Sequence, residues 1–127
     1  MDYRSKIRDS RNYIEKNLDQ KISLDDLARK VHLSKYYYHR LFHKMEGESI
    51  TKFINKRRME QAADALVKTN QPIIEIALKY QYGSQESFSR AFKRVYGLTP
   101  GKYRKTHLKS NPTDCSIRLN RIMAAAA

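Results

Sequence analysis

The feature that most constrains the fold is an internal repeat with a period of about 50 residues. In each copy, a helical pattern begins after a serine and ends at a glycine: Ser34 corresponds to Ser84, and Gly47 to Gly97. The apolar residues between these positions also correspond, with Tyr38, Leu41, Phe42 and Met45 matching Phe88, Ala91, Phe92 and Val95. Their i, i+3, i+4, i+7 spacing is typical of the buried face of a helix. The repeat therefore predicts two similar helical units.

A shorter helical pattern precedes each serine and repeats at a shift of 49 residues. Leu27 corresponds to Ile76 and Ala28 to Ala77, so Gly83 is a one-residue insertion between the two registers. Each copy thus predicts a short helix, a tight turn and a second, longer helix. This is the order of elements in a helix-turn-helix, whose second helix enters the major groove of DNA.

Sparse turn residues favour an all-α fold of about seven helices. The 127 residues include 4 glycines and 3 prolines, and no β-alternation persists. The uninterrupted stretch from Ile50 to Val67 predicts one long helix that joins two helix-turn-helix subdomains, and its two offset apolar groups indicate different packing neighbours at its two ends. At about 17 residues, this helix spans roughly 26 Å. Successive major-groove faces of B-DNA lie about 34 Å apart, so the two units could occupy adjacent grooves.

The predicted organisation has four parts. Residues 3–49 hold an N-terminal helix and the first helix-turn-helix, and residues 50–68 form the connecting helix. Residues 72–108 hold the second helix-turn-helix and a final helix, with Pro100 at the favoured first helical position. Residues 109–127 match no helical pattern and are expected to form a disordered tail.

The charge of the chain predicts a polyanionic partner. There are 26 Lys and Arg residues against 13 Asp and Glu residues, which gives a net charge of +13. No acidic residue lies between Ser87 and Thr113, whereas that window contains Arg90, Lys93, Arg94, Lys102, Arg104, Lys105 and Lys109. Such an excess attracts nucleic acid, although charge alone does not give sequence specificity.

The helix faces opposite the two buried stripes carry side chains that suit base edges. Arginine can bond guanine bidentately, glutamine can bond adenine, and glutamate can accept from cytosine N4. The predicted base-contacting residues are Lys35, Tyr36, His39 and Arg40 in the first copy and Gln85, Glu86, Ser89 and Arg90 in the second. The predicted phosphate-contacting residues are His43, Lys93, Arg94, Lys102 and Arg104.

Two runs of sequence carry a family resemblance. Residues 72–104, PIIEIALKYQYGSQESFSRAFKRVYGLTPGKYR, resemble the signature region of the AraC/XylS family of bacterial transcription regulators. Residues 23–47, SLDDLARKVHLSKYYYHRLFHKMEG, resemble the first helix-turn-helix of that family. The likeness covers residues 5–108 and is greatest to the stand-alone MarA/SoxS/Rob-like group. It implies a cytoplasmic, monomeric activator that binds an asymmetric promoter site and recruits RNA polymerase.

The resemblance also places residues of both predicted recognition helices against bases, with three departures from the MarA-like pattern. Tyr36 stands where those members carry tryptophan, His39 where they carry glutamine, and Glu86 where they carry a second glutamine. Their target sequence therefore does not carry over to this chain. The acid at Glu86 also leaves two positions open for the second recognition helix, which either enters the groove fully or rests on the DNA backbone. The sensory domain usual in the family is not recognised, so we expect either a stand-alone regulator or the DNA-binding fragment of a larger, ligand-responsive regulator.

The sequence does not predict an enzyme, a metal site or a cofactor. His39 and His43 have H-x-x-x-H spacing, but no H-E-x-x-H motif or third ligand accompanies them. The single cysteine, Cys115, has no nucleophile context and indicates a reducing compartment. No apolar run approaches the roughly 20 residues of a membrane span.

Three classes of function remain open at the level of sequence. The favoured class is a sequence-specific transcription regulator that binds double-stranded DNA. A non-specific basic protein that binds nucleic acid would have equal affinity for unrelated duplexes. A protein-interaction module would bind an acidic partner without DNA.

Overall fold

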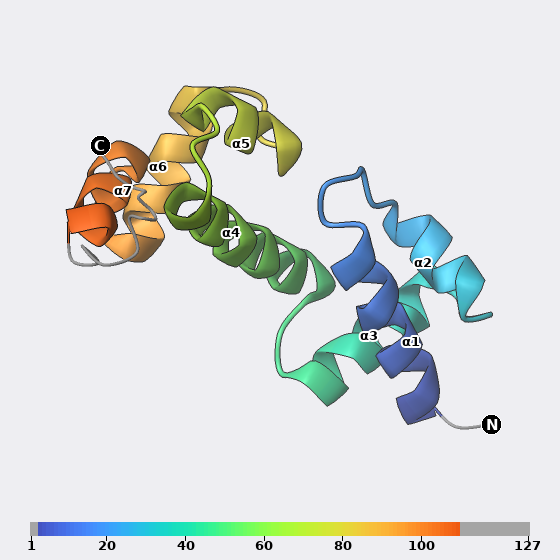
Figure 1. Ribbon diagram of the computed structural model, residues 1–127. Helices are drawn as coiled ribbons and strands as arrows, with labels where there is room; N and C mark the ends of the chain where they lie inside the picture. Colours follow the sequence, from blue (N-terminus) through green and yellow to red (C-terminus); the bar gives the residue numbers. More distant parts are fainter. Residues whose placement is uncertain (1–2, 110–127) are drawn as a thin grey trace. The chain divides into compact units, whose positions relative to one another are not determined.

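The computed structural model describes residues 3–109, and this part of the chain contains seven α-helices (Figure 1). They are α1 (Tyr3–Lys16), α2 (Leu24–Lys30), α3 (Lys35–Glu46), α4 (Ile50–Lys68), α5 (Ile73–Lys79), α6 (Gln85–Tyr96) and α7 (Pro100–Lys109). The predicted all-α fold of about seven helices is therefore confirmed. The predicted disordered tail begins one residue too early, because Lys109 is the last residue of α7. The rest of that predicted tail, from position 110 onward, lies outside the described residues.

The chain divides into two compact units, Met1–Met59 (unit 1) and Glu60–Ala127 (unit 2). The boundary falls within α4, because the two ends of this helix contribute to different cores. Its first part supplies three residues to the core of unit 1, Ile50, Phe53 and Ile54, and its last part supplies three to the core of unit 2, Ala62, Ala63 and Leu66. The sequence pattern groups the buried Met59 with Ala62, Ala63 and Leu66, whereas in the structure it falls in unit 1. The other residues of the two offset apolar groups have the predicted separate neighbours.

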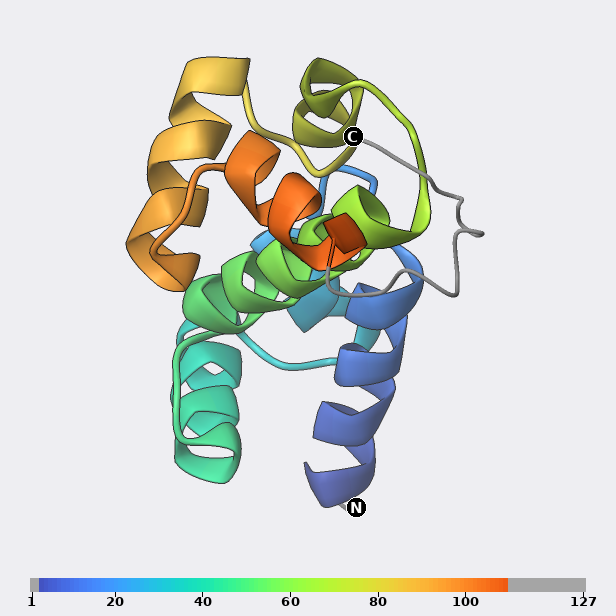
Figure 2. The ribbon, with the colours of Figure 1, turned by 60° about the vertical axis from the view of Figure 1, so that its left-hand side comes forward.

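In unit 1, α1 lies alongside α3, as the two views in Figures 1 and 2 show. The hydroxyl groups of Ser10 on α1 and Tyr38 on α3 share a buried hydrogen bond. The Tyr38 ring packs edge-on against Phe42, with centroids 6.2 Å apart, and Phe42 packs in the same way against Phe53 of α4 at 5.5 Å. These aromatic contacts anchor the buried face of α3, so its opposite face is turned outward.

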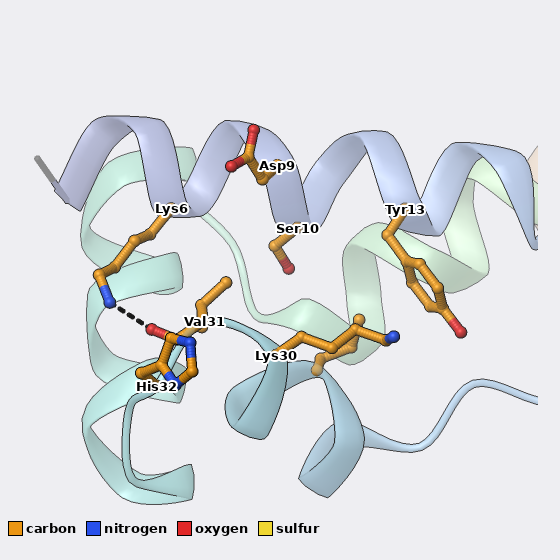
Figure 3. Close-up of a pocket in the computed structure, with 8 residues that line it drawn as sticks. Lys6, Asp9, Ser10, Tyr13, Lys30, Val31 and His32 are labelled. Carbon is orange, nitrogen blue, oxygen red and sulfur yellow. Dashed lines mark hydrogen bonds between the residues drawn. The ribbon is translucent and has the colours of Figure 1, made fainter.

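A second set of contacts ties α1 to the end of α2. The ammonium group of Lys6 donates to the backbone carbonyl of Val31, which follows α2 (Figure 3). Between the same two helices lies a recess of about 360 Å³, and within its lining the Lys30 ammonium lies 4.7 Å from the centroid of the Tyr13 ring. The short helix α2 is therefore held at its C-terminal end by side chains of α1.

In unit 2, aromatic rings join α6 to α7. Phe92 stacks on Tyr96 with centroids 4.6 Å apart and meets Tyr103 of α7 edge-on at 5.1 Å. The prediction that Val95 belongs to the buried stripe is wrong, because its side chain is 63% exposed. The physical reason is that Tyr96 stacks on Phe92, packs at a tilt against Tyr103 and so takes the inward position at the end of α6.

The two helix-turn-helix elements agree in their local hydrogen bonds. The Ser34 hydroxyl caps α3 by accepting from the backbone N–H of Tyr37 at 3.1 Å, and the Ser84 hydroxyl caps α6 by accepting from Ser87 at the same distance. Each of these helices has 12 residues and ends at a glycine with a φ of 80°, Gly47 or Gly97. Serine accepts readily at an N-cap, and glycine adopts the left-handed conformation at low cost. The predicted caps are therefore confirmed in both copies.

The turns between the paired helices also correspond. The backbone N–H of Leu33 donates to the carbonyl of Ala28 at 3.0 Å, and the N–H of Tyr82 donates to that of Ala77 at 3.0 Å. The residue before each donor has a left-handed backbone: φ is 60° at His32 and 74° at Gln81. The repeat is thus preserved in backbone conformation as well as in apolar pattern.

We expect Gly97→Ala to lower the free energy of unfolding by about 1 kcal/mol, because alanine is strained at a left-handed φ. A Cβ at this position meets no atom within 4 Å, so the cost comes from the backbone and not from a clash. Urea denaturation followed by circular dichroism measures the change. Gly83→Ala is the matched control, since its site is equally open but its φ is not left-handed. An equal loss in both variants would contradict the interpretation.

Candidate nucleic-acid interface

The outward face of α3 presents an arginine that is held by a neighbouring aromatic ring. The side chain of Tyr36 is 71% exposed, and the Arg40 guanidinium lies over its ring, 5.5 Å from the centroid. A weak hydrogen bond of 3.5 Å from the Arg40 Nη1 to the Tyr36 hydroxyl accompanies this contact. A cation over an aromatic face is stabilised electrostatically, so the guanidinium is partly ordered before any partner arrives.

The remaining predicted residues of α3 differ in accessibility. Lys35 and His43 are exposed, and the Lys35 ammonium lies 3.4 Å from the carboxylate of Asp25, which is a surface ion pair of small energy. His39 is only partly exposed, and its Nε2 is buried without a hydrogen-bond partner. A base contact through that atom therefore requires the His39 ring to turn outward.

The outward face of α6 brings all four predicted base-contacting residues of unit 2 together. Gln85, Glu86, Ser89 and Arg90 line one open recess of about 470 Å³. Gln85, Glu86 and Arg90 are exposed, and Ser89 is half-buried at the base of the set. The surface thus combines amide, carboxylate, hydroxyl and guanidinium groups, which are the groups that read base edges in the major groove.

A group of exposed cations accompanies this recess in unit 2. Lys93 and Arg94 lie in the last turn of α6, and Lys102 lies in the first turn of α7. None of the three forms an ion pair with another residue of the described chain. Their charges are therefore available to an external anion.

Arg104, predicted to contact phosphate, directs its guanidinium to backbone carbonyls of the same unit. Its Nε donates to the carbonyl of Leu66 at 2.8 Å, and its Nη2 donates to the carbonyls of Gln71 at 2.8 Å and Thr69 at 3.3 Å. Burial lowers the pKa of this guanidinium. Arg104 satisfies one carbonyl in the last turn of α4 and two that follow the helix, and we leave it out of the proposed phosphate-contacting set.

Unit 1 contains a similar arginine, Arg58, whose hydrogen bonds to backbone carbonyls could not be predicted from the sequence. Arg58 donates from Nε to the carbonyl of Leu18 at 2.9 Å and from Nη2 to that of Gln20 at 2.6 Å, just after α1. Arg58 and Arg104 are 46 residues apart and not 50, so the repeat alignment does not pair them. No local signal in the sequence distinguishes such an arginine from a surface one.

The structure holds no signal for a metal centre or a membrane span within its described range. No group of three or more His, Cys, Asp or Glu residues between positions 3 and 109 is placed to hold a metal ion. Among the described helices, none is both long and apolar enough to cross a membrane.

Comparison with known proteins assigns the class of this fold. A helix-turn-helix domain family matches residues 27–106, which include both paired-helix elements. The C-terminal domain of AraT, a response regulator from Geobacillus stearothermophilus, superposes with a TM-score of 0.74 and 31% identity, covering 96% of this chain and 90% of that one. The fold is therefore that of an AraC-type helix-turn-helix domain.

Relatives in sequence give the family. The transposon Tn10 TetD protein of Escherichia coli is 46% identical over 102 residues, which are 80% of this chain and 74% of TetD. The right origin-binding protein of Escherichia coli (strain K12) is 42% identical over 106 residues, which are 84% of this chain and 37% of the relative. The chain thus spans little more than a third of the latter protein. It belongs to the AraC/XylS family of DNA-binding transcription regulators.

We expect Arg104→Ala to lower the free energy of unfolding by about 2 kcal/mol, because it removes charge-assisted bonds to three carbonyls. Chemical denaturation measures this loss. The control is Lys105→Ala, which removes a charge from the neighbouring exposed position and should change the stability by less than about 0.5 kcal/mol. Equal stability of the two variants would show that the Arg104 bonds contribute little.

Proposed function

We propose that this chain regulates transcription by placing α3 and α6 in successive major grooves of one asymmetric promoter site. The observation that carries the proposal is the duplicated helix-turn-helix geometry, in which each second helix exposes an arginine at the same position, Arg40 or Arg90. A helix so capped and anchored on its apolar face presents a rigid polar face, which is what reading a groove requires.

Charge supports a DNA partner over an acidic protein. Phosphate contacts come chiefly from lysine and arginine, and they position a protein on the duplex without specifying sequence. Lys93 and Arg94 on α6 and Lys102 on α7 supply exposed cations in unit 2, and His43 is exposed on α3 in unit 1. We assign these four side chains to the phosphate backbone and the outward faces of α3 and α6 to the bases.

The two outward faces are chemically different, which favours an asymmetric site. A symmetric dimer reads two copies of one half-site, whereas a single chain with two unlike recognition helices reads two unlike half-sites. We therefore propose that the chain binds as a monomer. From the family resemblance we further propose that the chain acts in the cytoplasm as a transcription activator and that it recruits RNA polymerase.

Selection from a library of random duplexes at physiological salt tests the central proposal. The expected result is an enriched asymmetric motif with two blocks about one helical turn apart. Retention of DNA without enrichment of any sequence would favour a non-specific basic protein. Retention of no DNA would favour a protein-interaction module.

Arg40→Ala is expected to weaken binding to the selected site by about 1–3 kcal/mol, the range for a bidentate base contact. Fluorescence anisotropy on the selected duplex and on a scrambled duplex measures the difference. Arg8→Ala, on the exposed surface of α1, removes the same charge and serves as the control. If Arg40→Ala weakens both duplexes equally, Arg40 does not read a base.

Lys102→Ala is expected to weaken binding to the selected and scrambled duplexes to the same extent, since a phosphate contact carries no sequence information. The slope of log K against log salt should fall in magnitude by about one. Titrations at several salt concentrations measure that slope. An unchanged slope would remove Lys102 from the proposed phosphate-contacting set.

A further inference from the structure

The two outward helix faces differ at one pair of positions that correspond in the repeat. Tyr36 corresponds to Glu86, and Arg40 corresponds to Arg90, at the same i, i+4 spacing. In α3 the tyrosine ring holds the arginine. In α6 the carboxylate and the guanidinium form no ion pair, either with each other or with any other residue between positions 3 and 109. Unit 2 therefore exposes the Glu86 carboxylate and the Arg90 guanidinium one helical turn apart, and neither group is held in an ion pair within the described part of the chain.

A carboxylate is an unusual group on a surface that meets DNA. Glu86 is exposed in the first turn of α6 and lies in the same recess as Gln85, Ser89 and Arg90. Phosphates repel its charge, and the major groove removes part of its water. A carboxylate that loses water without gaining a hydrogen-bond donor is destabilised, so the penalty is offset only where the groove presents a donor.

The bases differ in what they present to such a group. In the major groove guanine presents two acceptors, thymine presents an acceptor and a methyl group, and adenine presents a donor beside an acceptor. Cytosine alone presents an amino donor without an acceptor on the same base edge. A carboxylate is therefore matched to cytosine and repelled by the acceptor atoms of the other three bases.

We propose that Glu86 makes unit 2 selective for a cytosine, next to a guanine that Arg90 contacts. This inference rests on the proposed function, because it names the base that one residue of the α6 face reads. Glu86 acts mainly by rejection: it weakens binding to every sequence that places guanine or thymine opposite its carboxylate. Arg90 supplies the attraction through the bidentate contact that arginine makes with guanine.

The first test compares the motifs that the wild-type chain and Glu86→Gln select from one random duplex library. Glutamine bonds adenine through N6 and N7, so the preferred base should change from cytosine to adenine at one position only. The expected shift in the cytosine-to-adenine ratio is tenfold or more. Glu75→Gln is the matched control, because Glu75 is an exposed acid in the first turn of α5 in the same unit, outside the α6 recess. It should select the wild-type motif.

The second test removes the amino group from the DNA instead of the carboxylate from the protein. The selected duplex is prepared with a cytosine analogue that lacks the 4-amino group at the assigned position. The wild-type chain should lose about tenfold in affinity, whereas Glu86→Gln should lose much less. This cycle isolates the contact between the carboxylate and the amino group. Thermal unfolding of each variant by circular dichroism confirms that the exposed substitution leaves the fold intact.

The outcomes separate this inference from the function on which it rests. If the wild-type chain and Glu86→Gln select the same base at every position, the role of Glu86 is overturned and the proposed function stands. If the wild-type chain selects no motif, both the proposed function and the inference about Glu86 are overturned. A cytosine preference that changes only in Glu86→Gln supports both.

Discussion

The left-handed turn between the paired helices is the constraint on which the rest of each unit depends. At this turn the chain bonds back to the carbonyl of an alanine in the first helix, Ala28 or Ala77, and both alanines are almost fully buried. The small side chain lets the two helices approach closely, and the bond fixes the direction in which the second helix leaves. That direction determines which face of the second helix packs on the aromatic core and which polar face is turned outward. The backbone at His32 and Gln81 adopts a conformation unfavourable for most residues, and the surrounding contacts sustain it.

Much of the fold could be predicted from the sequence because its signals are local. Serine caps, glycine ends and apolar stripes depend on neighbours within one or two turns, and the duplication allowed each to be checked against its counterpart. Tertiary contacts between residues far apart in the sequence were harder to predict. The exposure of Val95 depends on the packing of Tyr96 against Phe92 and against Tyr103 of the next helix. The left-handed residues His32 and Gln81 are neither glycine nor asparagine, so composition does not mark them.

For the candidate interface, the sequence predicted which side chains share the outward face of α6 more fully than it did for α3. The four residues expected on the outward face of α6 line one recess, because helical periodicity alone determines which side chains share a face. On α3 the same periodicity placed His39 outward, but packing around its ring covers Nε2. The role of Arg104 could not be predicted, since its carbonyl partners lie 33–38 residues away in sequence. A count of positive charges treats every arginine alike. Only the folded structure distinguishes an arginine that bonds backbone carbonyls from one that is exposed to a partner.

One helix, α4, supplies buried side chains to the cores of both units. Tandem modules joined by a loop can lose one member without damage to the other, but here the boundary between the units lies inside a continuous α-helix. Fraying of α4 from its first residue would withdraw apolar side chains from the core of unit 1, and fraying from its last residue would withdraw them from the core of unit 2. A break at the boundary would instead leave backbone N–H and C=O groups unpaired that the continuous helix pairs. The boundary between the units therefore offers no loop at which one copy could be separated from the other without breaking a helix.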